Sequence, residues 1–341
     1  MKNIFKLIFL LVIITFILSC TSLNIKKEPI EIPFTLNENN QIVVDLKIKA
    51  SEEENGKVLK CIVDTGSNSE MIELSQSGAR IFYGEQFSEI EKSQKEYFRN
   101  NLENICGKKS SDVNDIEIEE LYKGYGKLIQ SKSKIHSCSL GSFISKKIQY
   151  ICYQGNGSPM DSDAIIGYKF FDNTDVLTIN YKKKILIIDD YPINTVPIPL
   201  YFFKPTEKYF IPITINGEND FGIIDTGSEF FSIRHSNVDK ELSNSILKKP
   251  TPSKIKKAFK ILNNTDFEHT ASTYSQSIKQ LKISNVIFYD LEAIPVTNSN
   301  VETTSEFTKK LILSTNNLGY PVFKNSIIQF DFKRKLFYIT E

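Results

Sequence analysis

Two short motifs each place an aspartate on a turn that follows an apolar stretch of the chain. Asp-Thr-Gly-Ser occurs at residues 64–67, after Cys-Ile-Val, and again at residues 225–228, after Gly-Ile-Ile. The glycine permits a tight turn and lets a second backbone approach closely. Two carboxylates that face each other cannot both ionise cheaply, so such a pair shares one proton. One carboxylate can then act as a general base on water while the protonated one polarises a carbonyl group.

A second landmark follows each motif at a similar distance. A single Asp-Thr-Gly also occurs in ordinary surface turns, so the evidence for a functional site is that the motif occurs twice. Asp64 lies 103 residues before Gly167 and Asp225 lies 94 residues before Gly319, each glycine following an apolar residue. Alternating strand patterns around the basic turns at residues 182–184 and 333–335 come next in both copies. Matched landmarks at matched spacing indicate an internal duplication.

Strand patterns dominate the segments that must position these motifs. Apolar or alternating runs predict strands at residues 42–48, 58–63, 210–215, 221–224 and 278–288. Helical patterns are few: an amphipathic helix over residues 85–105 and short candidates at 239–247 and 303–311. Prolines cluster in residues 189–208, which suits a connector or a sheet edge. We therefore expect a mainly β chain with two similar lobes.

With both motifs established, the chain resembles the pepsin and retropepsin family of aspartic proteases in its two-lobed, single-chain form. The resemblance spans residues 30–339. It implies two similar β-barrel-like lobes of the acid-protease fold, with the active-site cleft between them. Residues 20–190 would form the N-terminal lobe, residues 191–207 the connector and residues 208–341 the C-terminal lobe. It further implies an aspartic endopeptidase that hydrolyses polypeptide with Asp64 and Asp225, without metal or cofactor.

The resemblance also assigns supporting roles within the two turns. The threonines would hydrogen-bond across the lobe interface, the glycines would supply backbone amides near the dyad, and the serines would donate to the outer carboxylate oxygens. These residues are Thr65, Gly66, Ser67, Thr226, Gly227 and Ser228. Behind the turns the family carries two apolar residues and a glycine. Ile165-Ile166-Gly167 fits that pattern, whereas Asn317-Leu318-Gly319 departs from it with a polar residue.

A β-hairpin flap bearing a tyrosine closes the cleft in the family. The best candidate for its tip is Gly124-Tyr125-Gly126, which precedes a strand-like stretch at residues 127–139. Tyr125 is therefore our flap candidate and Tyr122 the second choice. An ordinary turn is an equal alternative on turn chemistry alone.

The N-terminus has the pattern of a bacterial lipoprotein signal. Lys2 and Lys6 precede an apolar run that ends in Ile-Leu-Ser-Cys at residues 17–20. We interpret residues 1–19 as the signal peptide and Cys20 as the lipidated first residue. The protein would then be exported and lipid-anchored to the cell envelope, in a membrane leaflet that the sequence leaves open. A plain secretory peptide and an uncleaved anchor are the alternatives.

The remaining composition narrows the function classes. The 341 residues carry 42 basic and 41 acidic side chains, and a formal charge of +1 gives no electrostatic case for nucleic acid. Three scattered histidines offer no zinc pattern. Cys61, Cys106, Cys138 and Cys152 leave disulfides possible, although Cys61 suits a buried free thiol equally well.

The presence of both turns on one chain predicts an active monomer. Three functions remain open at this point. The first is a general endopeptidase, the second is a lipoprotein that binds a peptide or protein partner without turnover, and the third is an enzyme that processes one partner protein. Intact Asp-Thr-Gly turns in both copies favour an enzyme.

Overall fold

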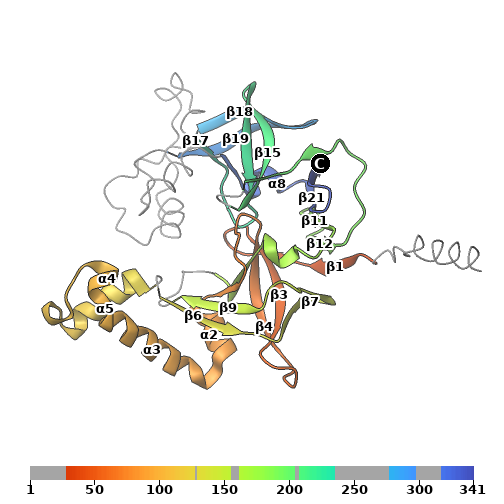
Figure 1. The fold of residues 1–341 in the computed structure, drawn as a ribbon. Helices are drawn as coiled ribbons and strands as arrows, with labels where there is room; N and C mark the ends of the chain where they lie inside the picture. Colours follow the sequence, from red (N-terminus) through yellow and green to blue (C-terminus); the bar gives the residue numbers. More distant parts are fainter. Residues whose placement is uncertain (1–27, 127–128, 155–160, 204–206, 235–275, 297–315) are drawn as a thin grey trace, which may run out of the picture.

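The computed structural model describes residues 28–126, 129–154, 161–203, 207–234, 276–296 and 316–341. Strands in three sheets are the main regular structure of this part of the chain, arranged as two lobes with a third sheet beside them (Figure 1). The expected mainly β, two-lobed architecture is confirmed. Cys20, the signal peptide and the helices expected at residues 239–247 and 303–311 lie outside the described residues.

The sheet of the first lobe delivers Asp64. In β3 (Ile42–Lys49) alternate side chains are buried, whereas in β4 (Lys57–Asp64) Cys61, Ile62 and Val63 are all buried. Strand β4 pairs antiparallel with β3 and parallel with β10 (Ala164–Gly167). Three consecutive buried residues mean that both faces of β4 are covered at this end, as is usual for a parallel pair, and this explains the continuous apolar run. The other strands of this sheet are β2 (Thr35–Leu36), β5 (Ile72–Leu74), β6 (Gln130–Lys134), β7 (Ser137–Leu140), β8 (Phe143–Ile144) and β9 (Tyr150–Gln154).

The sheet of the second lobe repeats this arrangement around Asp225. Strand β16 (Glu218–Ile224) pairs antiparallel with β15 (Lys208–Ile215) and parallel with β20 (Asn316–Leu318). The sequence pattern at residues 278–288 divides into two strands, β18 (Gln276–Ile283) and β19 (Val286–Val296), because Ser284 turns the chain with a φ of 56°. Pairing of β15 with β18 closes the sheet into a barrel. The remaining strands are β14 (Tyr201–Phe203) and β17 (Ser232–Arg234).

A six-stranded sheet joins the two halves of the chain. The hairpin of β11 (Val176–Asn180) and β12 (Ile185–Ile188) lies beside the hairpin of β21 (Ile327–Asp331) and β22 (Leu336–Thr340). These are the repeated strand patterns of the sequence, and their basic stretches form the expected hairpin tips. Lys184 and Lys335 hold equivalent turn positions with φ of 54° and 55°. The edges are β1 (Ile30–Pro33) and β13 (Ile198–Pro199).

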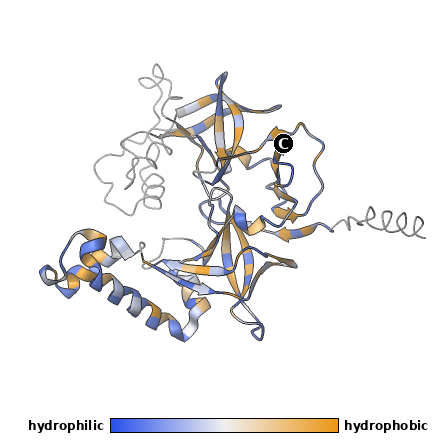
Figure 2. Cartoon of the chain, viewed as in Figure 1, coloured by the Kyte–Doolittle hydropathy of each residue, from blue (hydrophilic) through white to orange (hydrophobic). Residues whose placement is uncertain are grey.

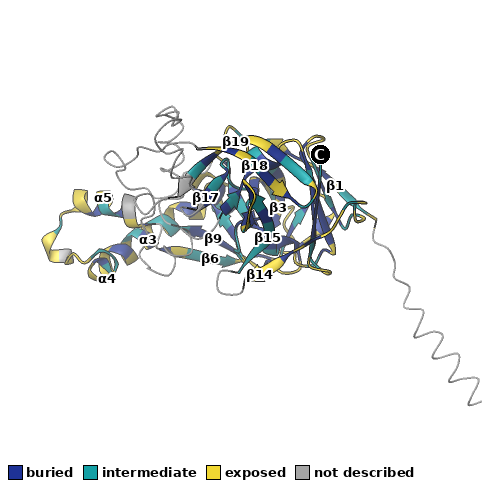
Figure 3. Ribbon diagram, turned by 90° about the horizontal axis from the view of Figure 1, so that it is seen from above, coloured by how far each residue is buried: buried dark blue, intermediate teal, exposed yellow. Residues whose placement is uncertain are grey.

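Helices gather in the first lobe between β5 and β6. They are α2 (Gln76–Tyr83), η1 (Gly84–Gln86), α3 (Phe87–Asn100), α4 (Leu102–Cys106), η2 (Ser110–Asp112) and α5 (Asp115–Tyr125). The single helix expected at residues 85–105 is divided into α3 and α4, which meet at Asn101. Helices α3, α4 and α5 form an arm that extends from the lobe in two perpendicular views (Figures 1 and 3). Short helices η4 (Tyr168–Phe171) and α8 (Tyr320–Phe323) follow the two landmark glycines.

The expected hairpin tip at Gly124-Tyr125-Gly126 is wrong, because this segment ends a helix. The side chain of Asn114 caps α5 by accepting hydrogen bonds from the Ile116 and Glu117 amides, and the Glu117 carboxylate accepts a hydrogen bond from the Asn114 amide. Such a capping box fixes a helix start. Tyr122, the second flap candidate, is buried against Phe98 of α3 with ring centroids 5.5 Å apart. Helical packing therefore prevails over the turn composition of Gly-Tyr-Gly.

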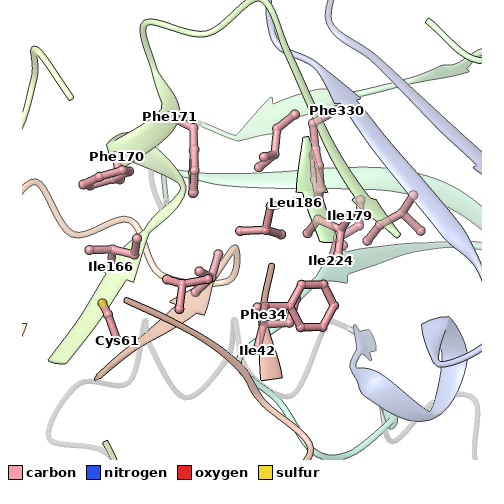
Figure 4. Close-up of a cluster of buried hydrophobic side chains, with 14 of the residues drawn as sticks. Phe34, Ile42, Cys61, Ile166, Phe170, Phe171, Ile179, Leu186, Ile224 and Phe330 are labelled. Carbon is pink, nitrogen blue, oxygen red and sulfur yellow. The ribbon is translucent and has the colours of Figure 1, made fainter. Parts of the chain in front are cut away.

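One apolar core runs through both halves of the chain. Figure 4 shows Ile42 of β3, Ile224 of β16 and Phe330 of β21 within one cluster, and in Figure 2 the strands of the sheets carry many hydrophobic residues, coloured orange. A smaller cluster lies inside the helical arm and consists of Phe98, Leu102, Ile118, Tyr122 and Ile129. All four described cysteines are free thiols, so Cys61 is the buried thiol that the sequence allowed. Among the described helices, none is long and apolar enough to cross a membrane.

Candidate active site

The two Asp-Thr-Gly-Ser turns have the same backbone geometry. Asp64 is the last residue of β4, and Asp225 directly follows β16. The Ser67 amide donates to the Asp64 carbonyl at 3.1 Å, and the Ser228 amide donates to the Asp225 carbonyl at 3.2 Å. Each turn is thereby closed on itself. We infer that the duplicated sequence encodes a duplicated local structure.

The landmark segments pack directly behind these turns. The amide that follows the landmark glycine binds the serine carbonyl in both lobes: Tyr168 N to Ser67 O at 3.2 Å and Tyr320 N to Ser228 O at 2.9 Å. Parallel pairing of β10 with β4, and of β20 with β16, holds these segments in register. The segments at the two landmark glycines therefore hold the Asp-Thr-Gly-Ser turns from behind.

The two threonines bind each other's lobe. Thr65 Oγ1 donates to the Ile224 carbonyl at 3.0 Å, and Thr226 Oγ1 donates to the Val63 carbonyl at 2.7 Å. Each hydroxyl also accepts the amide of the opposite threonine, at 3.2 Å and 3.0 Å respectively. Both threonines are buried. Four hydrogen bonds thus fix one turn against the other, in the role that the resemblance implied for these residues.

Each aspartate faces the glycine of the other lobe. A Cβ placed on Gly66 would lie 2.7 Å from Asp225 Oδ1, and one placed on Gly227 would lie 2.7 Å from Asp64 Oδ1. No side chain fits at that separation, so glycine is required at both positions. The glycine amides each donate to the aspartate of their own turn, Gly66 N to Asp64 Oδ1 at 2.8 Å and Gly227 N to Asp225 Oδ1 at 3.1 Å. The carboxylates therefore meet between the two turns.

Burial and mutual repulsion favour a proton at Asp64. Burial raises the pKa of Asp64 well above its ordinary value, and the charge of Asp225 and a hydrogen bond with it raise that pKa further. The positive charge of Lys208 and the Gly66 amide oppose this rise. Tyr181 lies near the pair, and burial, then the charge of Asp225, raises the pKa of this phenol. A facing pair in which one member keeps its proton is suited to combined acid and base chemistry.

The serines of the turns do not take the positions expected of them. Ser228 Oγ donates to the Phe230 carbonyl at 3.0 Å and accepts the Phe230 amide at 3.2 Å. Ser67 Oγ accepts the Ser69 amide at 3.3 Å. The expectation that Ser228 donates to the outer oxygen of Asp225 is wrong in this structure, because Phe230 O already accepts the hydroxyl proton. For Ser67, the described residues show no hydrogen bond from its hydroxyl to Asp64.

Asn317 contacts the pair, and sequence reasoning missed this contact. Its Nδ2 donates to Asp225 Oδ2 at 2.7 Å. The available signal was the polar residue in a position where Ile165 stands in the first copy. Tyr125, the flap candidate, lies at the end of α5 and is 40% exposed.

Among the described residues, no cluster of three or more histidine, cysteine, aspartate or glutamate side chains could hold a metal ion.

Comparison with protein-family models gives no match, and no curated protein matches the sequence. Among solved structures, the chain is similar to the crystal structure of aspartic proteinase from Irpex lacteus. That similarity has a TM-score of 0.45 and 13% sequence identity, and it covers 92% of this chain and 97% of the other.

Proposed function

We propose that this protein is an aspartic endopeptidase that hydrolyses peptide bonds with Asp64 and Asp225. The observation that carries the proposal is the reciprocal placement of the two carboxylates, each against the glycine of the other lobe. The threonine bonds across the lobes fix that placement. A surface turn would not need such an arrangement, whereas a proton-sharing pair does.

The proposed mechanism uses the unequal environments of the two acids. Asp64 holds the shared proton and donates a hydrogen bond to the oxygen of the scissile carbonyl. The Asp225 carboxylate removes a proton from a water molecule, whose oxygen bonds to the carbonyl carbon. The tetrahedral intermediate then breaks its carbon–nitrogen bond as the amine nitrogen takes a proton from the pair. Products leave as a free carboxylate and a free amine.

The direct test is hydrolysis of unfolded casein or a peptide library, with and without a statine-type transition-state mimic. Asp64→Asn and Asp225→Asn should each lower the rate at least about 100-fold, the scale of acid–base contributions. Circular dichroism and thermal melting would show that both variants keep their fold. Hydrolysis that neither variant lowers would exclude this pair. An inactive wild type that still binds the mimic would favour the non-catalytic peptide-binding lipoprotein.

We also propose export and attachment to the cell envelope through a lipid on Cys20. Support comes from the sequence pattern alone, since Cys20 lies outside the described residues. Radiolabelled palmitate should enter the wild-type protein and not a Cys20→Ala variant. Absence of label in the wild type would overturn the proposal.

The proposed active unit is a monomer, because one chain supplies both aspartate turns. Specific activity should therefore stay constant on dilution. A specific activity that falls on dilution and returns on concentration would show an obligate dimer.

A further inference from the structure

The second lobe places an amide where the first lobe places an aliphatic side chain. Ile165 lies opposite Ile62 in the pairing of β10 with β4, and Asn317 lies opposite Ile223 in the pairing of β20 with β16. Both residues stand two positions before the landmark glycine. Only the second reaches an aspartate of the pair, through Nδ2 of Asn317 and Oδ2 of Asp225 at 2.7 Å.

The orientation of this amide is fixed at a cost. Asn317 Oδ1 is buried and has no hydrogen-bond partner among the described residues. A buried oxygen without a donor destabilises a fold. Turning the amide over would bring Oδ1 against the Asp225 carboxylate and repel it. The bond from Nδ2 to the carboxylate therefore sets the orientation, and the unpaired oxygen is its consequence.

The aspartates consequently receive different numbers of donors. Asp225 accepts the Gly227 amide on Oδ1 and Asn317 Nδ2 on Oδ2. Asp64 accepts the Gly66 amide on Oδ1. Hydrogen bonds from N–H groups stabilise the charged form of a carboxylate. In the described residues, the side chain with more such donors is Asp225.

We propose that Asn317 is a positioning residue that holds the Asp225 carboxylate and stabilises its ionised form, so that the shared proton of the pair resides on Asp64. This inference rests on the proposed function. It gives the two carboxyl groups fixed roles, with Asp225 as the base and Asp64 as the acid. Asn317 performs this role through Asp225 and does not itself touch the substrate.

The other charged and titratable groups around the pair do not duplicate this role. Lys208, at the start of β15, lowers the pKa of Asp64 through its positive charge. Tyr181 directly follows β11, and burial raises the pKa of this phenol further above the range in which the pair titrates, so Tyr181 carries no charge there. Tyr320, at the start of α8, stacks edge-on with Tyr181 at 5.9 Å between ring centroids. Asn317 is thus the side chain through which β20 acts on Asp225.

The decisive variant is Asn317→Leu, which has a similar size and no donor. The acid limb of the profile of kcat/KM against pH belongs to the pair and reports its lower apparent pKa. Losing a hydrogen bond to a charged group should move this limb upward by about one pH unit. An acid limb that stays in place or moves downward would overturn the inference.

A matched control comes from the preceding residue. Asn316 is fully buried in the same strand, and its Nδ2 donates to Asp220 Oδ2 and the Phe221 carbonyl, both at 2.8 Å. Asn316→Leu should lower the melting temperature and leave the acid limb unchanged. A shift of the limb in Asn316→Leu equal to that in Asn317→Leu would show a structural effect and overturn the specific role.

A second variant covers the case in which Asn317→Leu does not fold. Asn317→Ile has the residue type that Ile165 has at the equivalent position of the first lobe, and it also removes the donor, so the acid limb should move upward as far as in Asn317→Leu. A downward shift would show that Asn317 accepts a hydrogen bond from a protonated Asp225, against the inference.

Carboxyl ¹³C NMR separates this inference from the proposed function, because it needs no turnover. Resonances of Asp64 and Asp225 are assigned by their loss in the Asp→Asn variants. If no peptide is cleaved but Asn317→Leu moves the Asp225 titration upward, the proposed function fails and the role of Asn317 stands. If peptide is cleaved and neither the rate profile nor the titration moves, the role of Asn317 fails alone.

Discussion

The two Asp-Thr-Gly-Ser turns share a backbone and differ in the groups that reach their carboxylates. The glycine amides bind their own aspartates at 2.8 Å and 3.1 Å, and the threonine hydroxyls bind the opposite lobe at 3.0 Å and 2.7 Å. In contrast, the positive charge of Lys208 lowers the pKa of Asp64, whereas Asn317 donates a hydrogen bond to Asp225. Duplication has preserved the geometry of the pair while the surroundings of the two acids have diverged.

The same difference extends to the lobes as a whole. The first carries the helical arm between β5 and β6, and the second closes its sheet by pairing β15 with β18. Neither feature changes the contacts at the turns. A proton-sharing pair needs symmetric positions to bring its carboxylates together, but unequal surroundings to give them separate roles.

The largest expected effect comes from adding a methyl group to either glycine of the pair. In Gly66→Ala the new Cβ would displace Asp225, and in Gly227→Ala it would displace Asp64. Each variant should lose about 100-fold or more in kcat/KM, since small misplacements of reacting groups have effects of this size. Equal losses would support the reciprocal geometry. A rate above about a tenth of wild type in either variant would contradict it.

The next effect concerns the threonines that join the lobes. Thr65→Val and Thr226→Val each leave a buried carbonyl and a buried amide without partners, and should lower the free energy of unfolding by about 2–4 kcal/mol. Denaturant titration measures this. Affinity for the statine-type mimic should fall in both variants.

Thr174→Val is the matched control for these two variants. Thr174 is buried and donates to the Phe171 carbonyl at 2.8 Å within one lobe. This variant should lose stability without losing affinity for the mimic. Equal affinity in all three variants would show that the threonines stabilise the fold and do not align the pair.

Replacing each aspartate should distinguish the two acids by their effect on stability. The raised pKa of Asp64 means that the folded chain holds a proton that the unfolded chain releases above about pH 4. The stability that this proton gives to the folded state is therefore complete below about pH 4, and it is lost as the pH rises through the pKa of Asp64 in the folded chain. Asp64→Asn, which resembles the protonated form, should melt above wild type at pH 7 and level with it near pH 3.

Asp225→Asn is the comparison, because it deprives Asn317 Nδ2 of a charged acceptor. It should gain no stability at pH 7. Equal gains in the two variants, measured by calorimetry across pH 3–8, would show that the proton is not confined to one side.

The core of this site was predictable from the sequence, and its surroundings were not. Asp64 and Asp225 could be found because a four-residue turn at the end of an apolar strand is a local pattern that occurs twice. Asn317 lies 92 residues beyond Asp225 in the chain and meets it through parallel pairing of β20 with β16. A pattern of residue types identifies such a strand but does not show which side chain reaches across it.

The flap prediction failed for a related reason. Gly124-Tyr125-Gly126 has the composition of a turn, yet α5 is fixed by its start at Asn114 and by packing of Tyr122 against Phe98. Ile118 and Tyr122 are both buried and are spaced by four residues, which is a helical signal in the sequence. Both readings of Gly-Tyr-Gly, a hairpin tip and an ordinary turn, were therefore wrong, because tertiary packing holds the segment as the end of α5.

A smaller effect is expected from the lysine beside the first acid. Lys208 lowers the pKa of Asp64, so Lys208→Gln should let Asp64 keep its proton to higher pH. The basic limb of the pH–rate profile should move upward by about half a unit, and the acid limb should stay in place. Lys282→Gln, on exposed surface of β18, is the control. A shift of both limbs in Lys208→Gln would show that Lys208 acts on the pair as a whole.

The smallest effect on the pH–rate profile is expected from Ser228, although its place in the same four-residue turn as Asp225 suggests a hydrogen bond to that carboxylate. Its hydroxyl donates to the Phe230 carbonyl at 3.0 Å and accepts the Phe230 amide at 3.2 Å, so both bonds stay within its own turn. Ser228→Ala should therefore cost about 1 kcal/mol of stability, the scale of one neutral hydrogen bond. The acid limb should stay where it is in the wild type, whereas Asn317→Leu moves it upward. If Ser228→Ala moves the limb as far as Asn317→Leu does, the hydroxyl turns toward Asp225 in the working enzyme. The difference between the two acids would then not depend on Asn317 alone.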